Sequence, residues 1–205
     1  MIMEKAFIFS SHPDVSELKF SELKHHLWSE KYPAFYSSRV AVCGVAEKGI
    51  FVCFEADEPS PRAVFENRDD PVYNDSCMEL FFQPFADDER YINFEINPNG
   101  AYLCAVGCDR NDRAFLREIS DCAPDIKACI SDSGWSAELF IPEQLVSDVF
   151  GRSFSVADTG YIRANCYKCG DLTPSPHYAS LFFVDTPNPD YHRPEFFGRI
   201  FFDKK

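Results

Sequence analysis

Residues 73–100 place the strongest constraint on what this chain can fold into. Within residues 91–97, apolar and polar side chains alternate with a period of two, which is typical of a strand with two different faces. Residues 77–83 alternate in the same way but more weakly. The polar residues 84–90 break the alternation between these two runs and indicate a turn. The stretch therefore predicts an antiparallel hairpin.

The polar face of the second strand carries an unusual set of side chains. Asn93, Glu95 and Asn97 follow Tyr91 at every second position, where a solvated face usually carries Lys, Thr or Ser. Amides and carboxylates in a row both donate and accept hydrogen bonds, as a polyol ligand requires. On this strand alone, a solvated sheet face is the preferred interpretation, and a ligand surface is the alternative.

The rest of the chain has the spacing of strand-like runs and turns that is typical of a β-rich protein. Eight to ten short strand-like runs are separated by turn signals, and no alternation of strands with long helices is visible. Short helices are expected within residues 16–30 and 142–150, the second one starting at a proline. We therefore predict an all-β fold, an antiparallel β-sandwich of immunoglobulin-like or jelly-roll type with one or two short helices. The length of 205 residues and the lack of repeats or linkers predict a single domain over residues 1–205.

The charge balance limits the partners. The chain has 20 basic and 33 acidic residues, a formal net charge of −13. A negative field repels nucleic-acid backbones and anionic lipids, so we expect neither nucleic acid nor a membrane surface as a partner. Neutral ligands and cations remain.

The sequence says little about the compartment. No apolar run is long enough to span a bilayer, and the first residues lack the pattern of a signal peptide. The nine cysteines are an odd number, and Cys43, Cys53, Cys104 and Cys129 lie in strand-like runs, where cysteine acts as a small buried hydrophobe. These features favour a reduced, cytoplasmic protein, while secretion stays open.

Six segments together resemble the family 9 carbohydrate-binding modules, particularly stand-alone members found in gut-type bacteria. The segments are VYNDSCMELFF, YINFEINPNGAY, WSAELFIP, IRANCYKCGD, PHYAS and PDYHRPEFFGRIFF. The resemblance implies a β-sandwich that binds the ends of plant polysaccharides, such as xylan or cellulose fragments, or small sugars. It also implies a structural calcium ion and an association with xylanases, hence with carbohydrate catabolism. In this family two aromatic rings clamp the sugar, and polar side chains bond its hydroxyl groups.

The resemblance assigns roles to particular residues. Tyr73 matches the first clamping aromatic ring, although Trp is typical there, and Glu79 matches a carboxylate that binds hydroxyl groups. Asn93 and Glu95 match two polar positions of the next strand, and Asn165 matches an asparagine of a later strand.

Two positions depart from the family pattern. Lys168 occupies the position where the family has its second clamping aromatic residue, and Asn93 occupies a position where the family has an arginine. Lys168 could instead donate to ring or anomeric oxygens of a sugar. Asn97 either belongs to the same binding surface or caps the turn at residues 98–100, and the second role is preferred.

Metal sites have weaker support. Cys166 and Cys169 form a C-x-x-C pair without a second pair at zinc spacing. Asp69, Asp70 and Asp75 offer hard oxygen ligands for calcium, although a solvated acidic loop explains them as well. We expect no required cofactor.

The sequence leaves three functions open. The first is non-catalytic saccharide binding by Tyr73, Glu79, Asn93, Glu95 and Asn165, with a glycoside hydrolase as a candidate partner. The second is a glycoside hydrolase in which Glu79 and Glu95 form the acid and base pair. The third is a protein-interaction module that has lost its sugar site. For the first, a few hydrogen bonds and one stacked ring predict an affinity between roughly micromolar and millimolar.

Overall fold

The structure is a computed structural model that describes residues 3–204. Fourteen strands form one hydrogen-bonded network in these residues, with the order β10-β11-β5-β4-β1-β14-β12-β6-β7-β8-β9, while β13 pairs with β12 and β3, and β2 pairs with β4. The strands are β1 (Met3–Phe9), β2 (Ser21–Glu22), β3 (His25–His26), β4 (Ser38–Val45), β5 (Gly49–Ala56), β6 (Cys77–Gln83), β7 (Tyr91–Ile96), β8 (Tyr102–Gly107), β9 (Arg113–Phe115), β10 (Asp125–Ile130), β11 (Trp135–Pro142), β12 (Tyr161–Cys169), β13 (Tyr178–Ser180) and β14 (Gly198–Lys204). The helices are α1 (Glu143–Phe150) and α2 (Val156–Thr159), with single 3-10 turns at η1 (Val15–Glu17), η2 (Val72–Asn74), η3 (Leu116–Glu118) and η4 (Pro194–Phe196).

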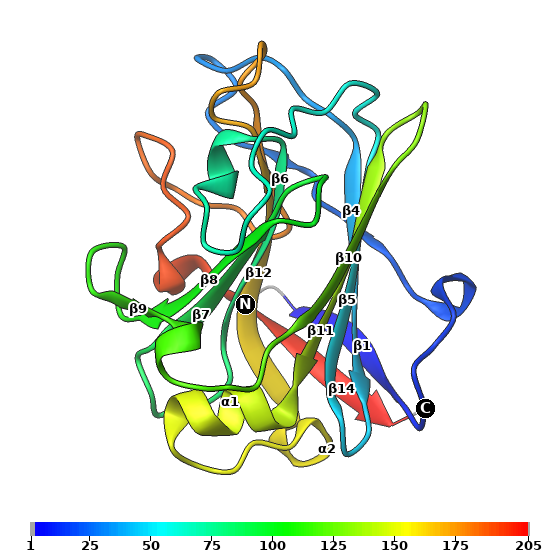
Figure 1. Ribbon diagram of the computed structural model, residues 1–205, viewed down its shortest axis with the longest axis vertical. Helices are drawn as coiled ribbons and strands as arrows, with labels where there is room; N and C mark the ends of the chain where they lie inside the picture. Colours follow the sequence, from blue (N-terminus) through cyan, green and yellow to red (C-terminus); the bar gives the residue numbers. More distant parts are fainter. Residues whose placement is uncertain (1–2, 205) are drawn as a thin grey trace.

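The sheet curls so that its two halves face each other. Figure 1 shows β4, β5, β10 and β11 on one side and β6, β7, β8 and β12 on the other, with β1 and β14 running between them at the lower end of the view. The largest cluster of buried apolar side chains takes members from both halves, including Val52 and Leu139 on one side and Leu80 and Phe94 on the other. The main core therefore fills the space inside the curled sheet.

The expected all-β class with one or two short helices is confirmed, but the strands form one curled, mixed sheet rather than a wholly antiparallel sandwich of immunoglobulin-like or jelly-roll type. β1 runs parallel to β14 and also parallel to β4. The sequence indicated only an extended lead-in over residues 1–15. The prediction therefore missed a strand that inserts between two others and joins the halves of the sheet.

The predicted hairpin of β6 and β7 is present, and both of its faces are covered. Ile92, Phe94 and Ile96 point into the main core, as their alternation predicted. The opposite face was expected to be polar and open, yet every residue of β6 and β7 is buried. A second apolar cluster that includes Phe81 and Tyr91 covers part of that face.

The prediction of a helix within residues 16–30 is wrong, whereas the helix predicted within residues 142–150 is confirmed as α1. Leu23 and Leu27 are buried, but their backbone N–H groups donate to Ser38 at 2.9 Å and to Tyr178 at 3.0 Å, not to a helical turn. Leu23 packs in the main core and Leu27 in the second apolar cluster, so their spacing of four residues does not mark one face of a helix.

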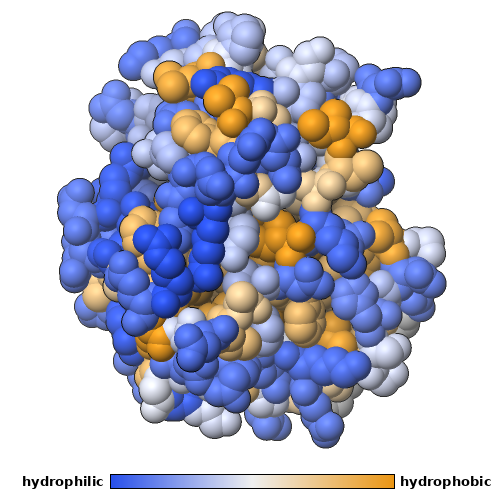
Figure 2. Space-filling model, in the orientation of Figure 1, coloured by the Kyte–Doolittle hydropathy of each residue, from blue (hydrophilic) through white to orange (hydrophobic). Residues whose placement is uncertain are grey.

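The surface is mixed in character. Figure 2 shows small hydrophobic areas between predominantly hydrophilic side chains on the viewed face. Within residues 3–204, helices are too short and too polar for any of them to cross a membrane.

Candidate functional site

A cavity with a volume of about 270 Å³ opens on the outer face of β6 and β7. Two loops border it, residues 107–113 and 186–193, which lie on the left of Figure 1 in green and orange-red. Its lining combines carboxylates, arginines and aromatic rings: Tyr73, Glu79, Phe81, Glu95, Arg110, Arg113, Cys169, Asp171, Tyr178, Pro189, Asp190, Tyr191 and His192. We call this cavity the β6–β7 pocket.

Two glutamates form the floor of the β6–β7 pocket. Glu79 and Glu95 are register partners on the antiparallel strands β6 and β7, so their side chains project to the same face. Each is only 3% exposed. They are therefore desolvated groups at the base of an open cavity, not members of a solvated strand face.

The surroundings of these two carboxyl groups favour their neutral forms. Burial, reinforced by the charge of Glu95, raises the pKa of Glu79 well above its ordinary value. Burial also raises the pKa of Glu95 to about 7, although Arg113 and Arg110 act in the opposite direction. Burial therefore favours the neutral form of Glu79, in which the carboxyl group can donate as well as accept a hydrogen bond.

Glu95 keeps one oxygen free for a ligand. Its Oε1 atom accepts a hydrogen bond from the Asn93 side-chain amide at 3.0 Å and lies 3.9 Å from a terminal nitrogen of Arg113. Its Oε2 atom is buried and has no hydrogen-bond partner among the described residues. A buried polar atom without a partner carries a free-energy cost of about 1–3 kcal/mol, which a ligand hydroxyl group would remove.

Arginines and acidic groups line the mouth of the pocket. Arg113 is held in place by Asn93, whose side-chain oxygen accepts a hydrogen bond at 3.2 Å, and by the backbone oxygen of Arg110 at 3.0 Å. Arg110 pairs with Asp190 at 3.3 Å. The mouth therefore presents both donors and acceptors in fixed positions.

Aromatic rings supply the apolar walls. Tyr73 stands at the rim with 40% of its surface exposed, whereas Tyr178 and Tyr191 are almost completely buried. Tyr191 stacks on Tyr167 with ring centroids 4.0 Å apart, and its hydroxyl donates to the Lys168 carbonyl oxygen at 2.9 Å. An exposed ring at the rim beside a rigid aromatic wall suits a ligand with a flat, C–H-rich face.

The structure brings three of the sequence-predicted residues together in the pocket: Tyr73, Glu79 and Glu95. Asn93 lies directly behind them and is completely buried, where it orients Glu95 and Arg113. Arg113, which Asn93 holds, brings a guanidinium group to the pocket in this chain.

Asn97 and Asn165 lie outside the pocket lining, and both are completely buried. The Asn97 side-chain oxygen accepts from the N–H groups of Asn99 and Ala101, so it closes the turn, while its amide group donates to Asp75 at 2.9 Å. Asn165 exchanges two hydrogen bonds with the backbone of Phe182. Because these side chains are occupied by the protein itself, we assign both of them structural roles.

Lys168 faces away from the pocket. It is the register partner of Met78, whose side chain lies in the main core, and it is 0% exposed. Its Nζ atom lies 3.0 Å from Glu58 Oε2 and 2.6 Å from His177 Nε2. The structure therefore does not bring Lys168 to the place of a second clamp, because neighbouring residues of a strand point to opposite faces.

The three aspartates proposed for calcium do not form a joint site. Asp75 accepts hydrogen bonds from the Val64 and Phe65 backbone N–H groups at 2.8 and 2.9 Å and also pairs with Arg62. Asp70 caps the backbone of Asn67, and Asp69 pairs with Arg117.

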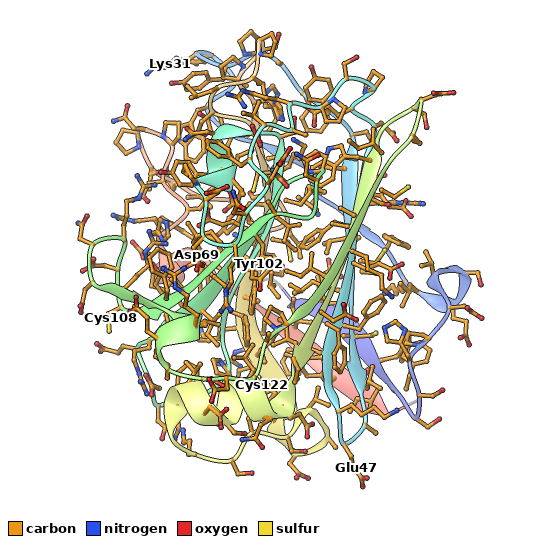
Figure 3. All side chains as sticks on the ribbon, in the orientation of Figure 1. Lys31, Glu47, Asp69, Tyr102, Cys108 and Cys122 are labelled. Atoms are coloured by element: carbon orange, nitrogen blue, oxygen red, sulfur yellow. The ribbon has the colours of Figure 1, made fainter. Side chains whose placement is uncertain are left out.

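Asp69 donates its backbone N–H to Tyr102, and Figure 3 shows these two labelled residues side by side. Since protein donors already satisfy Asp70 and Asp75, and a cation pairs with Asp69, the three carboxylates do not fit a bound calcium ion.

Sequence reasoning missed most of the pocket wall. Arg110 and Arg113 belong to a segment that had no predicted role, and Tyr178 and Tyr191 belong to segments that carried the family resemblance without an assigned role. The signal was available in the PHYAS and PDYHRP motifs, where a tyrosine and a histidine lie close to proline. Their convergence depends on loops whose paths the sequence does not give.

A cavity of this kind on a β-rich fold is typical of a small-molecule binding module. Comparison with known proteins identifies the class: a family model described as carbohydrate-binding family 9 matches residues 11–202. The chain therefore belongs to this family of carbohydrate-binding modules. A search of curated proteins found none that matches the chain.

Three solved structures have a similar fold. A candidate carbohydrate-binding protein from Bacteroides uniformis ATCC 8492 is 25% identical, with a TM-score of 0.81 and 98% of each chain covered. A family 9 module from Caldicellulosiruptor kristjanssonii in complex with cellotriose is 11% identical, with a TM-score of 0.70 over 100% of this chain and 95% of that one. A family 9 module from the same organism in complex with glucose is 9% identical, with a TM-score of 0.64 over 98% and 97% of the two chains. The last two show the fold alone.

Proposed function

We propose that this protein binds a saccharide without catalysing its conversion, and that the β6–β7 pocket holds the terminal sugar. The observation that carries the proposal is Glu95, a buried carboxylate on the pocket floor with one oxygen unpartnered. A sugar hydroxyl group would supply that partner, and Glu79 beside it would bond a second hydroxyl group.

The remaining pocket residues fit the other parts of a pyranose. Tyr73 offers an exposed ring at the rim for the C–H face of the sugar, and Arg113 offers donors for hydroxyl or ring oxygens. The volume of about 270 Å³ is just below the ~300–1,000 Å³ typical of small-molecule pockets. The pocket therefore suits the end of a chain rather than the middle of a long polymer.

Oligosaccharides of cellulose and xylan are the finer proposal for the ligand. They follow from the family resemblance and from the cellotriose and glucose complexes of two structural relatives. A role beside a glycoside hydrolase in polysaccharide degradation extends this proposal by the same resemblance. The affinity expected from four or five hydrogen bonds and one stacked ring is between roughly micromolar and millimolar.

A glycan array followed by calorimetry tests the proposal. We expect the wild type to bind cello- or xylo-oligosaccharides and Glu95→Gln to bind them at least about tenfold more weakly, a loss of about 1.4 kcal/mol. Glu118→Gln, at an exposed position outside the pocket lining, is the matched control. The proposal fails if no saccharide binds, or if aryl glycosides are hydrolysed by the wild type and not by Glu95→Gln.

A further inference from the structure

At the base of the β6–β7 pocket, two cysteines that have no role in the proposed saccharide binding lie beside Glu79. Within residues 3–204, Cys77, Glu79 and Cys169 form the one group of three His, Cys, Asp or Glu residues whose ligand atoms lie within 4.8 Å of one another. All three residues are at most 3% exposed. Two thiols and a carboxyl group therefore converge at the base of a cavity.

The fold brings these groups together through strand register. Cys77 and Cys169 are register partners on the antiparallel strands β6 and β12, and Glu79 lies two positions after Cys77 on the same face. The Cys169 thiol donates to Glu79 Oε1 at 2.9 Å. The C-x-x-C motif gave no hint of this arrangement, because Cys166 is three positions from Cys169 and points into the main core.

We propose that Cys77, Cys169 and Glu79 bind a zinc ion at the base of the β6–β7 pocket. Thiolate and carboxylate ligands suit Zn²⁺, which takes Zn–S distances of about 2.3 Å and Zn–O distances of about 2.0–2.2 Å in a tetrahedral arrangement. Ligand atoms that lie within 4.8 Å of one another can surround such an ion after a small adjustment of their side chains.

The site has three protein ligands and one open side. Cys169 and Glu79 both line the pocket, whereas Cys77 lies behind them. The fourth coordination position therefore faces the cavity, where a water molecule or a ligand oxygen completes the tetrahedron. Binding releases the two thiol protons and the proton of Glu79 to solvent, so the affinity for the ion rises with pH.

A test of this site must exclude metal binding by the other cysteines. Cys108 and Cys129 are exposed and Cys122 is half-buried, and Figure 3 labels Cys108 at the edge of the molecule and Cys122 beside α1. A reference variant with Cys108→Ser, Cys122→Ser and Cys129→Ser removes thiols that could bind an ion from solution. Cys77→Ser and Cys169→Ser are then made in this reference, and Cys104→Ser serves as the control at another fully buried cysteine.

Cobalt replaces zinc as the probe, because its thiolate complexes absorb light. The reduced reference protein is titrated with Co²⁺, without any saccharide, and zinc is added afterwards. We expect a thiolate-to-cobalt charge-transfer band that saturates at one ion per chain, disappears when zinc displaces cobalt, and survives in the Cys104→Ser variant. Cys77→Ser and Cys169→Ser should each lose the band while circular dichroism shows the same folded sheet.

Two outcomes would overturn the zinc site. The first is a reduced reference protein that shows no charge-transfer band. The second is a band of equal strength in Cys77→Ser or Cys169→Ser. Since the titration contains no sugar, its failure says nothing against saccharide binding, and a failed glycan array says nothing against the ion. Where Cys77→Ser does not fold, Glu79→Gln gives the same test by weakening cobalt binding without removing a thiol.

Discussion

Glu79 and Glu95 lie directly opposite each other on adjacent strands, and both carboxyl groups are buried at the base of one pocket. The charge of Glu95 adds to burial in raising the pKa of Glu79, because ionising both groups would bury two like charges. Their proximity therefore affects the folding free energy as well as ligand binding.

The first prediction concerns the stability of the metal-free protein, measured in the presence of a chelator. The pKa of Glu95 is about 7 in the folded state against an ordinary value of 4.5. The folded state therefore binds more protons than the unfolded state between these values, so this group lowers the free energy of unfolding as pH rises from about 4.5 to about 7. The loss is on the order of 3 kcal/mol if Glu95 alone is considered.

Glu95→Gln isolates this contribution from the other titrating groups. Chemical denaturation of the wild type and the variant at several pH values gives the difference between their unfolding free energies. We expect the variant to gain stability relative to the wild type as pH rises through this window. A difference that does not depend on pH would show that Glu95 is ionised throughout, held by Arg113 and Arg110.

The second prediction concerns the exposed ring at the rim of the pocket. Tyr73→Ala removes the flat surface on which a sugar face would stack, so we expect saccharide affinity to fall about tenfold, or by about 1.4 kcal/mol. Tyr73→Phe keeps the ring and should bind nearly as well as the wild type. Calorimetry with the ligand found on the array measures both, and Tyr161→Ala, outside this pocket, is the control. Equal losses in the alanine and phenylalanine variants would instead assign the contribution to the hydroxyl group.

Alternation along the strand predicted the hairpin of β6 and β7 because local periodicity reports on which side chains share a face. It placed Glu79 and Glu95 correctly on one face, since register follows from the pattern and the turn. It could not show that this face is buried. That burial comes from Tyr191 and His192, which belong to a loop far along the chain.

The family pattern predicted the position of Glu79 correctly, because Glu79 lines the pocket, but it did not predict that the Lys168 side chain points away from the pocket. The match in sequence puts Lys168 where a clamping ring stands in relatives, but one position along a strand reverses the direction of the side chain. In this chain the aromatic wall is built by Tyr178 and Tyr191. A single sequence cannot reveal which rings line the pocket, because the loops that bring them there leave no periodic signal.

The third prediction concerns Lys168 as part of the core. Burial alone would raise the pKa of Glu58, but Lys168, Ser76 and His177 hold it below its ordinary value, so Glu58 is a buried anion that needs its cation. Burial and the charge of Lys168 lower the pKa of His177 to about 4. The neutral ring therefore donates from Nδ1 to the Ser175 carbonyl oxygen and accepts from Lys168 at Nε2.

Lys168→Met leaves the Glu58 carboxylate without its cation, so we expect a loss of about 3–5 kcal/mol in the free energy of unfolding. Saccharide affinity should be unchanged at temperatures where the variant remains folded, because the Lys168 side chain points away from the pocket. Thermal and chemical unfolding measure the first effect and calorimetry the second. The double variant Glu58→Gln with Lys168→Met should recover part of the loss. Weaker saccharide binding by folded Lys168→Met would contradict this assignment.

The fourth prediction concerns calcium and Asp75. This carboxylate is 0% exposed and accepts hydrogen bonds from Val64, Phe65 and Asn97 while it pairs with Arg62. Its charge is therefore stabilised by protein groups, and no oxygen is left over for an ion. We expect millimolar Ca²⁺ to leave the Tm of the wild type unchanged within about 1 °C.

Asp75→Asn keeps the shape of this side chain but removes the charge that holds Arg62 and two loop N–H groups. We expect a loss of about 2–4 kcal/mol, since hydrogen bonds to a charged group contribute about 1.5–3 kcal/mol each and the amide retains part of them. The loss should be the same with and without Ca²⁺ in thermal unfolding experiments. If calcium stabilises the wild type but not Asp75→Asn, the loop around Asp75 binds the ion and Arg62 must move away when it does.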